Sequence, residues 1–182
     1  VIDNNSFQND FDNFVVWAES SFEVVIVLYQ HDVEKFDIKS QNYENMPLYI
    51  IRNSENLGFA KGNNVGLTFS QYMNTELVLL LNNDTEIENC AISKMIQFLR
   101  SNTSYSVVTP QIRLFSNKEL IWNCGGYFKW HGNRKYYYAS SHHSEIPENK
   151  KIIDIEFVTG CCLMYRVSEL GLLSDKFFFG EE

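Results

Sequence analysis

The apolar and polar positions of the chain fall into runs that predict alternating strands and helices. Dense apolar runs, rich in leucine or β-branched residues, are typical of buried strands. The predicted strands lie at residues 22–29, 47–52 and 76–81. The predicted helices lie at residues 10–20, 59–73 and 89–100. This succession predicts an α/β fold with a mostly parallel, Rossmann-like central sheet and helices on its faces.

The second half of the chain differs from the first in composition and in its pattern of apolar residues. Residues 122–138 are rich in glycine and aromatic side chains, which predicts a hairpin or an extended loop. Residues 154–166 are apolar and strand-like, and residues 167–172 suit one or two helical turns. Residues 31–45 are polar and irregular, so we expect a loop there.

Length, composition and charge narrow the class of protein. The 182 residues leave room for one core, and 45% hydrophobic with 21% charged residues is a globular balance that excludes disordered and fibrous chains. The net charge is −8 and no run of Lys or Arg occurs, so we expect no nucleic-acid partner. No apolar stretch approaches the ~18–20 residues of a membrane span.

The patterns of cysteine and histidine argue against disulfide and zinc scaffolds. The cysteines are Cys90, Cys124, Cys161 and Cys162, and they show no CxxC spacing. Such a pattern favours a reduced, cytoplasmic protein. The histidines are His31, His131, His142 and His143, and they match neither HExxH nor the spacing of a structural zinc site.

Both ends of the chain resemble the interior of a domain. Residues 1–6 read as the end of an apolar strand that leads into a polar loop, and residues 177–179 are an apolar run just before the last residues. Domain termini usually lie in exposed polar segments. We therefore expect these 182 residues to be the middle of a larger domain.

Three glycines spaced four apart, Gly58, Gly62 and Gly66, accompany the helix predicted at residues 59–73. They share one helix face, where the missing Cβ atoms allow another backbone or a ligand to approach closely. The segment matches neither GxGxxG nor a P-loop. Lys61 could supply a cation to a diphosphate, and the alternative is tight helix–sheet packing beside a solvated lysine.

A short polar turn, Asn82-Asn83-Asp84-Thr85, follows the strand predicted at residues 76–81. Ligands of open α/β sheets bind at the carboxyl ends of the strands. Asp84 at such an edge could hold Mg²⁺ or Mn²⁺ together with substrate phosphates. The alternative is an Asx turn or a helix cap.

Two further groups could take part in chemistry. Glu181 and Glu182 follow an apolar run, and a carboxylate that is partly removed from water suits a general base, although an acidic helix start is equally compatible. The aromatic side chains around Trp130 could stack on sugar rings, or they could form the packed face of a hairpin.

Six motifs follow one another along nearly the whole chain. They are Val1-Ile2-Asp3-Asn4-Asn5-Ser6, Glu55-Asn56-Leu57-Gly58-Phe59-Ala60-Lys61-Gly62-Asn63-Asn64, Leu80-Leu81-Asn82-Asn83-Asp84-Thr85, Gly125-Gly126, Phe157-Val158-Thr159-Gly160 and Phe177-Phe178-Phe179-Gly180-Glu181-Glu182. Each is weak alone, but in this order they resemble glycosyltransferase family 2, of the GT-A fold, in its rhamnosyltransferase-like branch.

This resemblance implies an inverting, metal-dependent transferase with a three-layer GT-A sandwich. The residues that it assigns to the nucleotide are Asp3, Asn5, Gly58, Lys61, Asn64 and Asn83. Asp84 corresponds to the ligand of Mg²⁺ or Mn²⁺, and Asn82 replaces the first acidic residue of the family's DxD motif. Glu182 corresponds to the catalytic base, with Glu181 beside it. Compared with the family, the first strand and the C-terminal part are missing from these 182 residues, so we expect the chain by itself to be a poor catalyst. The residues assigned to the donor sugar or the acceptor are Gly126, Trp130 and Gly160.

The expected function is transfer of a hexose or deoxyhexose, with rhamnose among the candidates, from a dTDP- or UDP-sugar to a glycan or lipid-linked hydroxyl. We expect one domain, with a nucleotide-binding half at residues 1–110 and an acceptor-side half at residues 111–182. A cytoplasmic location is expected, and peripheral association with the inner membrane face is compatible with a lipid-linked acceptor. The alternatives are a catalytically impaired nucleotide-sugar-binding fragment, a sugar nucleotidyltransferase and a non-catalytic sugar-binding module.

Overall fold

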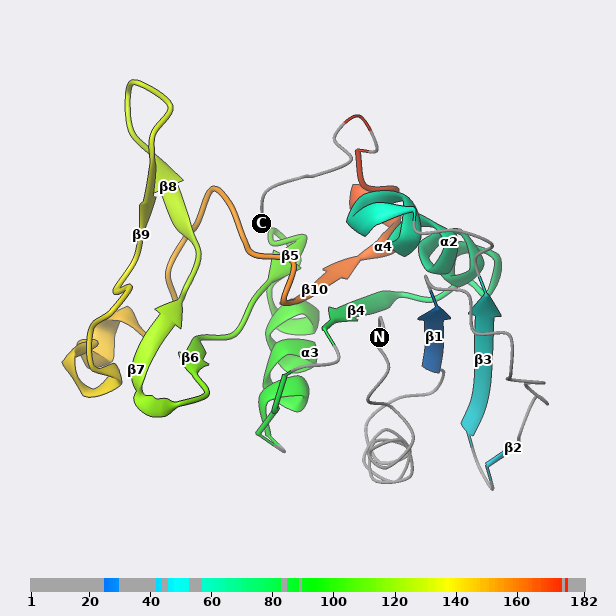
Figure 1. Ribbon diagram of the computed structural model, residues 1–182, viewed down its shortest axis with the longest axis horizontal. Helices are drawn as coiled ribbons and strands as arrows, with labels where there is room; N and C mark the ends of the chain where they lie inside the picture. The colour runs from blue at the N-terminus through cyan, green and yellow to red at the C-terminus, as the bar shows by residue number, and fades with distance from the viewer. Residues whose placement is uncertain are drawn as a thin grey trace.

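The computed structural model describes residues 25–29, 42–43, 46–52, 57–82, 85–88, 90–174 and 176. Their elements form two three-stranded sheets, helices packed against them, and a smaller group of strands to one side (Figure 1). The helix expected at residues 10–20 lies outside the described residues, as does most of the loop expected at residues 31–45.

The first sheet contains β1 (Val25–Tyr29), β3 (Met46–Arg52) and the short β2 (Asn42–Tyr43). β1 and β3 run parallel along their whole length, and β2 pairs antiparallel with the other edge of β3. The strands predicted at residues 22–29 and 47–52 are therefore confirmed, within three residues at each end.

The second sheet has β10 (Cys162–Arg166) at its centre, between β4 (Leu77–Leu81) and β5 (Val107–Val108). β10 is antiparallel to both neighbours, so β4 and β5 point the same way on either side of it. The described strands are thus mixed in direction rather than mostly parallel as predicted. An apolar strand that is covered on both faces suits a central position in either direction, so the composition of β10 did not reveal its direction.

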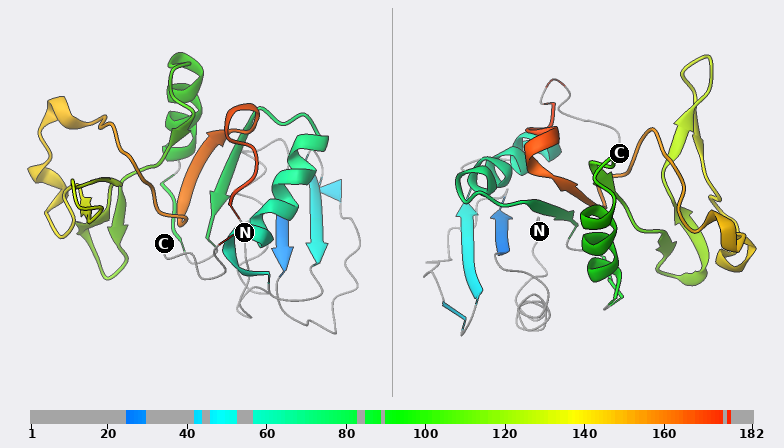
Figure 2. Two further views of the ribbon diagram at one scale, coloured as in Figure 1. Left: turned by 90° about the horizontal axis from the view of Figure 1, so that it is seen from above. Right: turned by 180° about the vertical axis from the view of Figure 1, so that it is seen from behind.

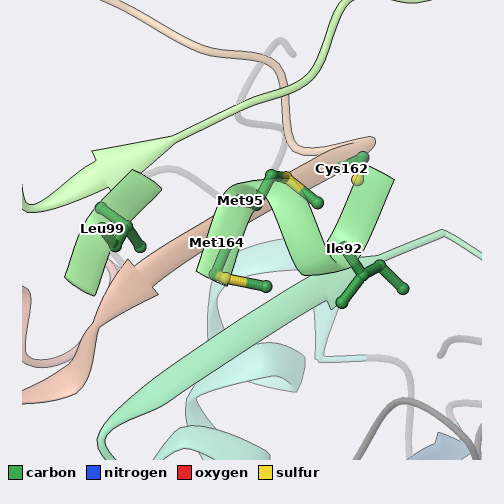
Figure 3. Close-up of a cluster of buried hydrophobic side chains, with 5 residues drawn as sticks. All are labelled: Ile92, Met95, Leu99, Cys162 and Met164. Atoms are coloured by element: carbon green, nitrogen blue, oxygen red, sulfur yellow. The ribbon is translucent and has the colours of Figure 1, made fainter. Parts of the chain in front are cut away.

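The second sheet lies between two helices, α2 (Gly58–Tyr72) and α3 (Ala91–Ser101). Successive side chains of β10 point to opposite faces, as a strand requires. The buried cluster on the α3 face consists of Ile92, Met95, Leu99, Cys162 and Met164 (Figure 3). The buried cluster on the α2 face consists of Leu67, Leu80, Leu163 and Tyr165. Helix, sheet and helix therefore form three layers around the core.

The helices agree closely with the apolar patterns that predicted them. α2 and α3 differ by one or two residues from the predicted bounds, and the short α4 (Val167–Leu170) lies at the predicted residues 167–172. α2 also contacts β1 and thereby connects the two sheets. Within the described residues, no helix is long and apolar enough to cross a membrane.

Between β5 and β10 the chain leaves the sheet at residues 109–161, a segment that we call the excursion. It lies to one side of the molecule in Figures 1 and 2. Its strands pair as two antiparallel hairpins, β6 with β7 and β8 with β9. Its elements are β6 (Ile112–Leu114), β7 (Asn117–Asn123), β8 (Gly126–Phe128), β9 (Arg134–Tyr136) and the short helices η1 (His143–Glu145) and η2 (Glu148–Lys150). The hairpin predicted at residues 122–138 is confirmed.

Gly126 lies where three segments of backbone converge, and alanine there should destabilise the excursion. Its N–H donates to the Phe157 carbonyl at 3.3 Å, and a Cβ at this position would lie 2.1 Å from the Lys135 carbonyl oxygen. Because a backbone oxygen cannot rotate away, Gly126→Ala should lower the free energy of unfolding by about 1–3 kcal/mol in chemical denaturation. Ser116→Ala, at an exposed position, should change it by less than about 0.5 kcal/mol. Equal effects of the two changes would contradict the crowding at Gly126.

Candidate functional site

Three segments that are distant in the sequence meet at one place. At the end of β4, the Asn82 N–H donates to the Cys161 carbonyl, the residue before β10, at 2.9 Å. A Cβ on Gly160 would lie only 2.4 Å from Cζ of Phe59, in the first turn of α2. The start of α2, the end of β4 and the start of β10 therefore form one site, which we call the α2–β4–β10 junction.

The start of α2 brings positive charge to this junction. The chain enters α2 through Gly58, whose φ of 73° lies in the left-handed region that favours glycine. Lys61, in the first turn, is exposed, and its ammonium group makes no ion pair within the described part of the chain. The positive end of a helix dipole beside a lysine attracts anions. A nucleotide contact for Gly58 and Lys61 stays a prediction.

Asn64 has a structural partner in the described residues. Its Nδ2 donates to the Leu173 carbonyl at 2.9 Å, and its Oδ1 accepts from the Leu173 N–H at 2.8 Å. Both polar atoms of the amide thus hold the segment after α4 against α2. The nucleotide contact assigned to Asn64 would have to replace these bonds, and it stays a prediction.

The turn after β4 is partly described. The Asn82 carbonyl accepts a hydrogen bond from the Thr85 hydroxyl at 2.6 Å, which turns the chain directly after the strand. Asn83 and Asp84, between them, lie outside the described residues. An amide oxygen and a carboxylate at this point are oxygen donors of the kind that Mg²⁺ and Mn²⁺ prefer, so the donor set fits the expected cation.

Gly126 and Trp130 are not brought to the junction. Both belong to the β8–β9 hairpin, which lies apart from α2 and β4 in Figures 1 and 2. Trp130 is 96% exposed. It lies in the turn of the hairpin, which is closed by a 2.9 Å hydrogen bond from the Lys129 N–H to the Asn133 carbonyl. The neighbouring aromatic side chains pack on one another instead: Phe128 and Tyr136 both contact the ring of Phe157.

The remaining predicted site residues lie outside the described part of the chain. They are Asp3, Asn5, Glu181 and Glu182. The structure does bring together one group that the sequence reasoning missed, Glu119 with His142 and His143. The adjacent histidines were visible in the sequence, but no motif pointed to a carboxylate more than twenty residues earlier.

Burial also changes the chemistry of the cysteines. It raises the pKa of the Cys124 thiol to about 11, against a smaller opposing effect of Arg113. It raises the pKa of the Cys162 thiol to about 12, and Cys161 adds to that effect. At neutral pH these two thiols stay protonated and are weak nucleophiles. Cys90 is exposed.

The raised pKa values of Cys124 and Cys162 predict a loss of stability in alkaline solution. A thiol with a raised pKa keeps its proton in the folded chain at pH values where the unfolded chain has lost it. Its stabilising contribution is complete below the unfolded pKa of about 8.5 and disappears as the pH rises toward the folded values. The thermal midpoint should therefore fall from pH 8 to pH 11, and less steeply in Cys124→Ser than in Cys90→Ser. A midpoint that rises with pH would contradict this result.

The family comparison agrees with the geometry of the junction. The sequence model of Glycosyl transferase family 2 matches residues 31–171, which is most of the chain and includes all three segments of the junction. The chain belongs to glycosyltransferase family 2. No curated protein matches the sequence closely enough to add a nearer relative. Membership implies the GT-A type of α/β fold, a nucleotide-sugar donor and an acceptor for the transferred sugar.

Proposed function

We propose that this glycosyltransferase inverts the configuration of a hexose or deoxyhexose as it transfers the sugar from a nucleoside diphosphate to an acceptor hydroxyl. The observation that carries this proposal is the α2–β4–β10 junction. There, a helix start with an exposed lysine, the polar end of a buried strand and a glycine-containing segment meet. The helix start supports an anion-binding role, and Asn82 at the end of β4 supports a cation site in the turn that follows it.

The nucleotide is proposed to bind mainly residues in the first half of the chain, 1–110. Lys61 and the N-terminal end of α2 attract the diphosphate through their positive charge. Asp3 and Asn5 are proposed to contact the base and ribose, with Asn83 beside them. Gly58 leaves the backbone accessible to the phosphates because it has no side chain.

Asp84 and Asn82 are proposed to hold Mg²⁺ or Mn²⁺. An amide, a carboxylate, waters and diphosphate oxygens together make an ordinary oxygen coordination shell for such an ion. When bound, the ion neutralises the charge that develops on the departing diphosphate. The chain has a net charge of −8, so a bound cation also offsets repulsion between the protein and its anionic donor.

The acceptor is proposed to bind mainly residues in the second half of the chain, 111–182. Glu182 takes the proton from the acceptor hydroxyl as that oxygen attacks the anomeric carbon from the face opposite the leaving group. Glu181 supports the acceptor or orients the base. Gly160 is proposed to border the donor sugar through its backbone, because the Phe59 ring fills the space that a side chain would take. The hairpin that contains Gly126 and the exposed Trp130 is proposed to meet a longer acceptor.

The proposed donor is a dTDP- or UDP-sugar, with rhamnose as one candidate. The proposed acceptor is a growing glycan or a lipid-linked sugar, which would place the protein in the cytoplasm, at the inner face of the membrane. Nucleotide binding at the donor site is the simplest test, because a nucleotide is a simpler ligand than either complete substrate.

Thermal unfolding with dTDP, UDP and GDP, each with and without Mn²⁺, tests the donor site. A nucleotide at about 100 times its dissociation constant adds ~2.7 kcal/mol to the free energy of unfolding. For a domain of this size the midpoint should rise by roughly 5–10 °C with the correct nucleotide. Asp84→Ala should remove the Mn²⁺-dependent part, and Lys61→Ala should weaken binding, whereas Lys129→Ala, an exposed lysine on the hairpin, should not.

Other outcomes would overturn parts of the proposal. A shift that survives in both Asp84→Ala and Lys61→Ala would mean that the nucleotide binds elsewhere. Stabilisation by a nucleoside triphosphate and a sugar phosphate, without a response to the diphosphates, would favour a nucleotidyltransferase. Binding of oligosaccharides without any nucleotide would favour a sugar-binding module.

A further inference from the structure

The excursion brings two adjacent histidines against a carboxylate of β7. The segment before η1 runs alongside β7, held by the Ile121 N–H donating to the Ser141 carbonyl and by the Ser140 N–H donating to the Ile121 carbonyl, both at 2.9 Å. Leu120 and His142 form an isolated antiparallel bridge beside them. This backbone pairing fixes the position of His142 relative to Glu119 on β7.

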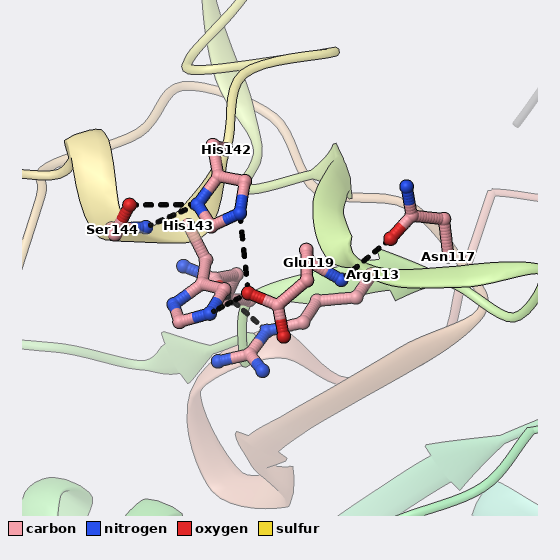
Figure 4. A network of polar contacts seen from close by, with 7 residues as sticks. Arg113, Asn117, Glu119, His142, His143 and Ser144 are labelled. Atoms are coloured by element: carbon pink, nitrogen blue, oxygen red, sulfur yellow. Dashed lines mark hydrogen bonds and ion pairs between the residues drawn. The ribbon is translucent and has the colours of Figure 1, made fainter.

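The three side chains converge on a single oxygen. Oε2 of Glu119 lies 2.9 Å from Nε2 of His143 and 3.2 Å from Nε2 of His142 (Figure 4). The two imidazole rings are stacked, with 5.1 Å between their centroids and 22° between their planes. One ligand atom from each residue lies within 4.8 Å of the others, and all three side chains remain accessible to solvent.

We propose that Glu119, His142 and His143 bind a divalent transition-metal ion of the zinc class. Zinc binds imidazole nitrogen and carboxylate oxygen at roughly 2.0–2.2 Å, so neighbouring ligands of a tetrahedral ion lie about 3.3 Å apart. The two separations from Oε2 are close to this value, and small rotations of exposed side chains would open the space for an ion. Three protein ligands leave the fourth position to water.

The imidazole of His142 has a neighbour of the kind that a metal-bound histidine uses. Nδ1 of His142 lies 2.7 Å from the hydroxyl of Ser144. With a metal on Nε2, the neutral ring carries its proton on Nδ1, and the Ser144 hydroxyl is in place to accept it. The longer 3.3 Å contact from the Ser144 N–H to Nδ1 would then be given up. Asn117 holds the backbone of the third ligand, since its Oδ1 accepts from the Glu119 N–H at 3.1 Å.

This site differs from the proposed donor site in its ligands. Imidazole nitrogens favour zinc-like ions, whereas the oxygen donors Asn82 and Asp84 favour Mg²⁺ or Mn²⁺. β7 and η1 lie in the excursion, and Lys118 of β7 forms an ion pair with Glu86 in the segment after β4. A metal here would join β7 to η1 at the base of the β8–β9 hairpin. It would therefore hold the excursion together.

Without a metal, the cluster is of little consequence for stability. The side chain of Glu119 is 58% exposed, and those of His142 and His143 are 39% and 32% exposed. Ion pairs as exposed as these contribute little, because water screens them and the side chains lose freedom on pairing. A metal site and an exposed ion pair therefore differ in one measurable property, which is whether the cluster binds Zn²⁺.

Titration calorimetry of the metal-free chain with Zn²⁺, in the absence of nucleotide, tests the proposal. We expect one ion per chain and a rise in thermal midpoint. His143→Ala and Glu119→Gln should abolish binding, and Ser144→Ala should weaken it about tenfold or more. His131→Ala provides the matched control, since this histidine is exposed in the turn of the hairpin and should leave binding unchanged. Circular dichroism of each metal-free variant shows whether it is folded.

Cobalt spectroscopy separates the proposed ligands from the cysteines. Co²⁺ in a site of nitrogen and oxygen ligands should give visible d–d bands without the near-ultraviolet band of thiolate ligation. A thiolate band, or binding that survives in folded His143→Ala and Glu119→Gln, would overturn the proposal in favour of Cys90 or another thiol. Absence of Zn²⁺ binding to the folded chain would reduce the cluster to an exposed ion pair.

Discussion

Replacing Glu182 by glutamine is expected to slow sugar transfer by about 10²–10⁴-fold, the contribution typical of a positioned general base. Glutamine keeps the shape of the side chain but cannot accept the proton of the acceptor hydroxyl. The comparison is with the rate of the unaltered chain, whatever its absolute value. The measurement is the initial rate of transfer at saturating donor and acceptor.

Nucleotide binding distinguishes loss of the base from loss of the fold. Glu182→Gln should leave the Mn²⁺-dependent shift in thermal midpoint unchanged, because the base contacts the acceptor rather than the nucleotide. Glu145→Gln, at an exposed position of η1, is the matched control for the removal of one negative charge. If both variants transfer sugar at the unaltered rate, another residue is the base.

Truncation of Leu99 is the stability change with the largest expected effect. Leu99 is fully buried in the cluster that joins α3 to β10. Removing a buried leucine side chain loses its transfer free energy and leaves a cavity, so Leu99→Ala should lower the free energy of unfolding by about 2–5 kcal/mol. For a domain of this size the thermal midpoint should fall by roughly 5–15 °C.

Leu172→Ala is the matched control for this change. Leu172 is half exposed, and its loss should lower the free energy of unfolding by less than about 1 kcal/mol. If Leu99→Ala were equally mild, the α3 layer would contribute little to the stability of the fold.

Helices and strands that follow from the spacing of nearby apolar residues were predicted well from the sequence. The periodic apolar residues of α3 place Ile92, Met95 and Leu99 on one side of the helix, which is the side that packs on the sheet. The run of apolar residues in β4 predicted a buried strand, and Asn82 follows its end as expected. In the candidate site, Gly58 and Lys61 lie at the start of a helix, as the motif indicated.

Features that depend on which segments pair could not be predicted in this way. The direction of β10 follows from how the chain returns from its excursion, and an apolar run carries no information about direction. Asn64 could be assigned to a ligand because its hydrogen-bond partner, Leu173, is more than a hundred residues away. A local motif shows which atoms can form hydrogen bonds, but not which partner they will meet.

The sequence by itself determines the family, the alternation of strands and helices, and the lysine at the start of α2. Short-range spacing and the order of the motifs are enough to establish these properties. The meeting of Phe59 with Gly160, and of Glu119 with His143 over 24 residues, arises only after the strands have paired. Long-range contacts depend on the sheet order and on the course of the excursion. Neither is encoded in the spacing of neighbouring residues.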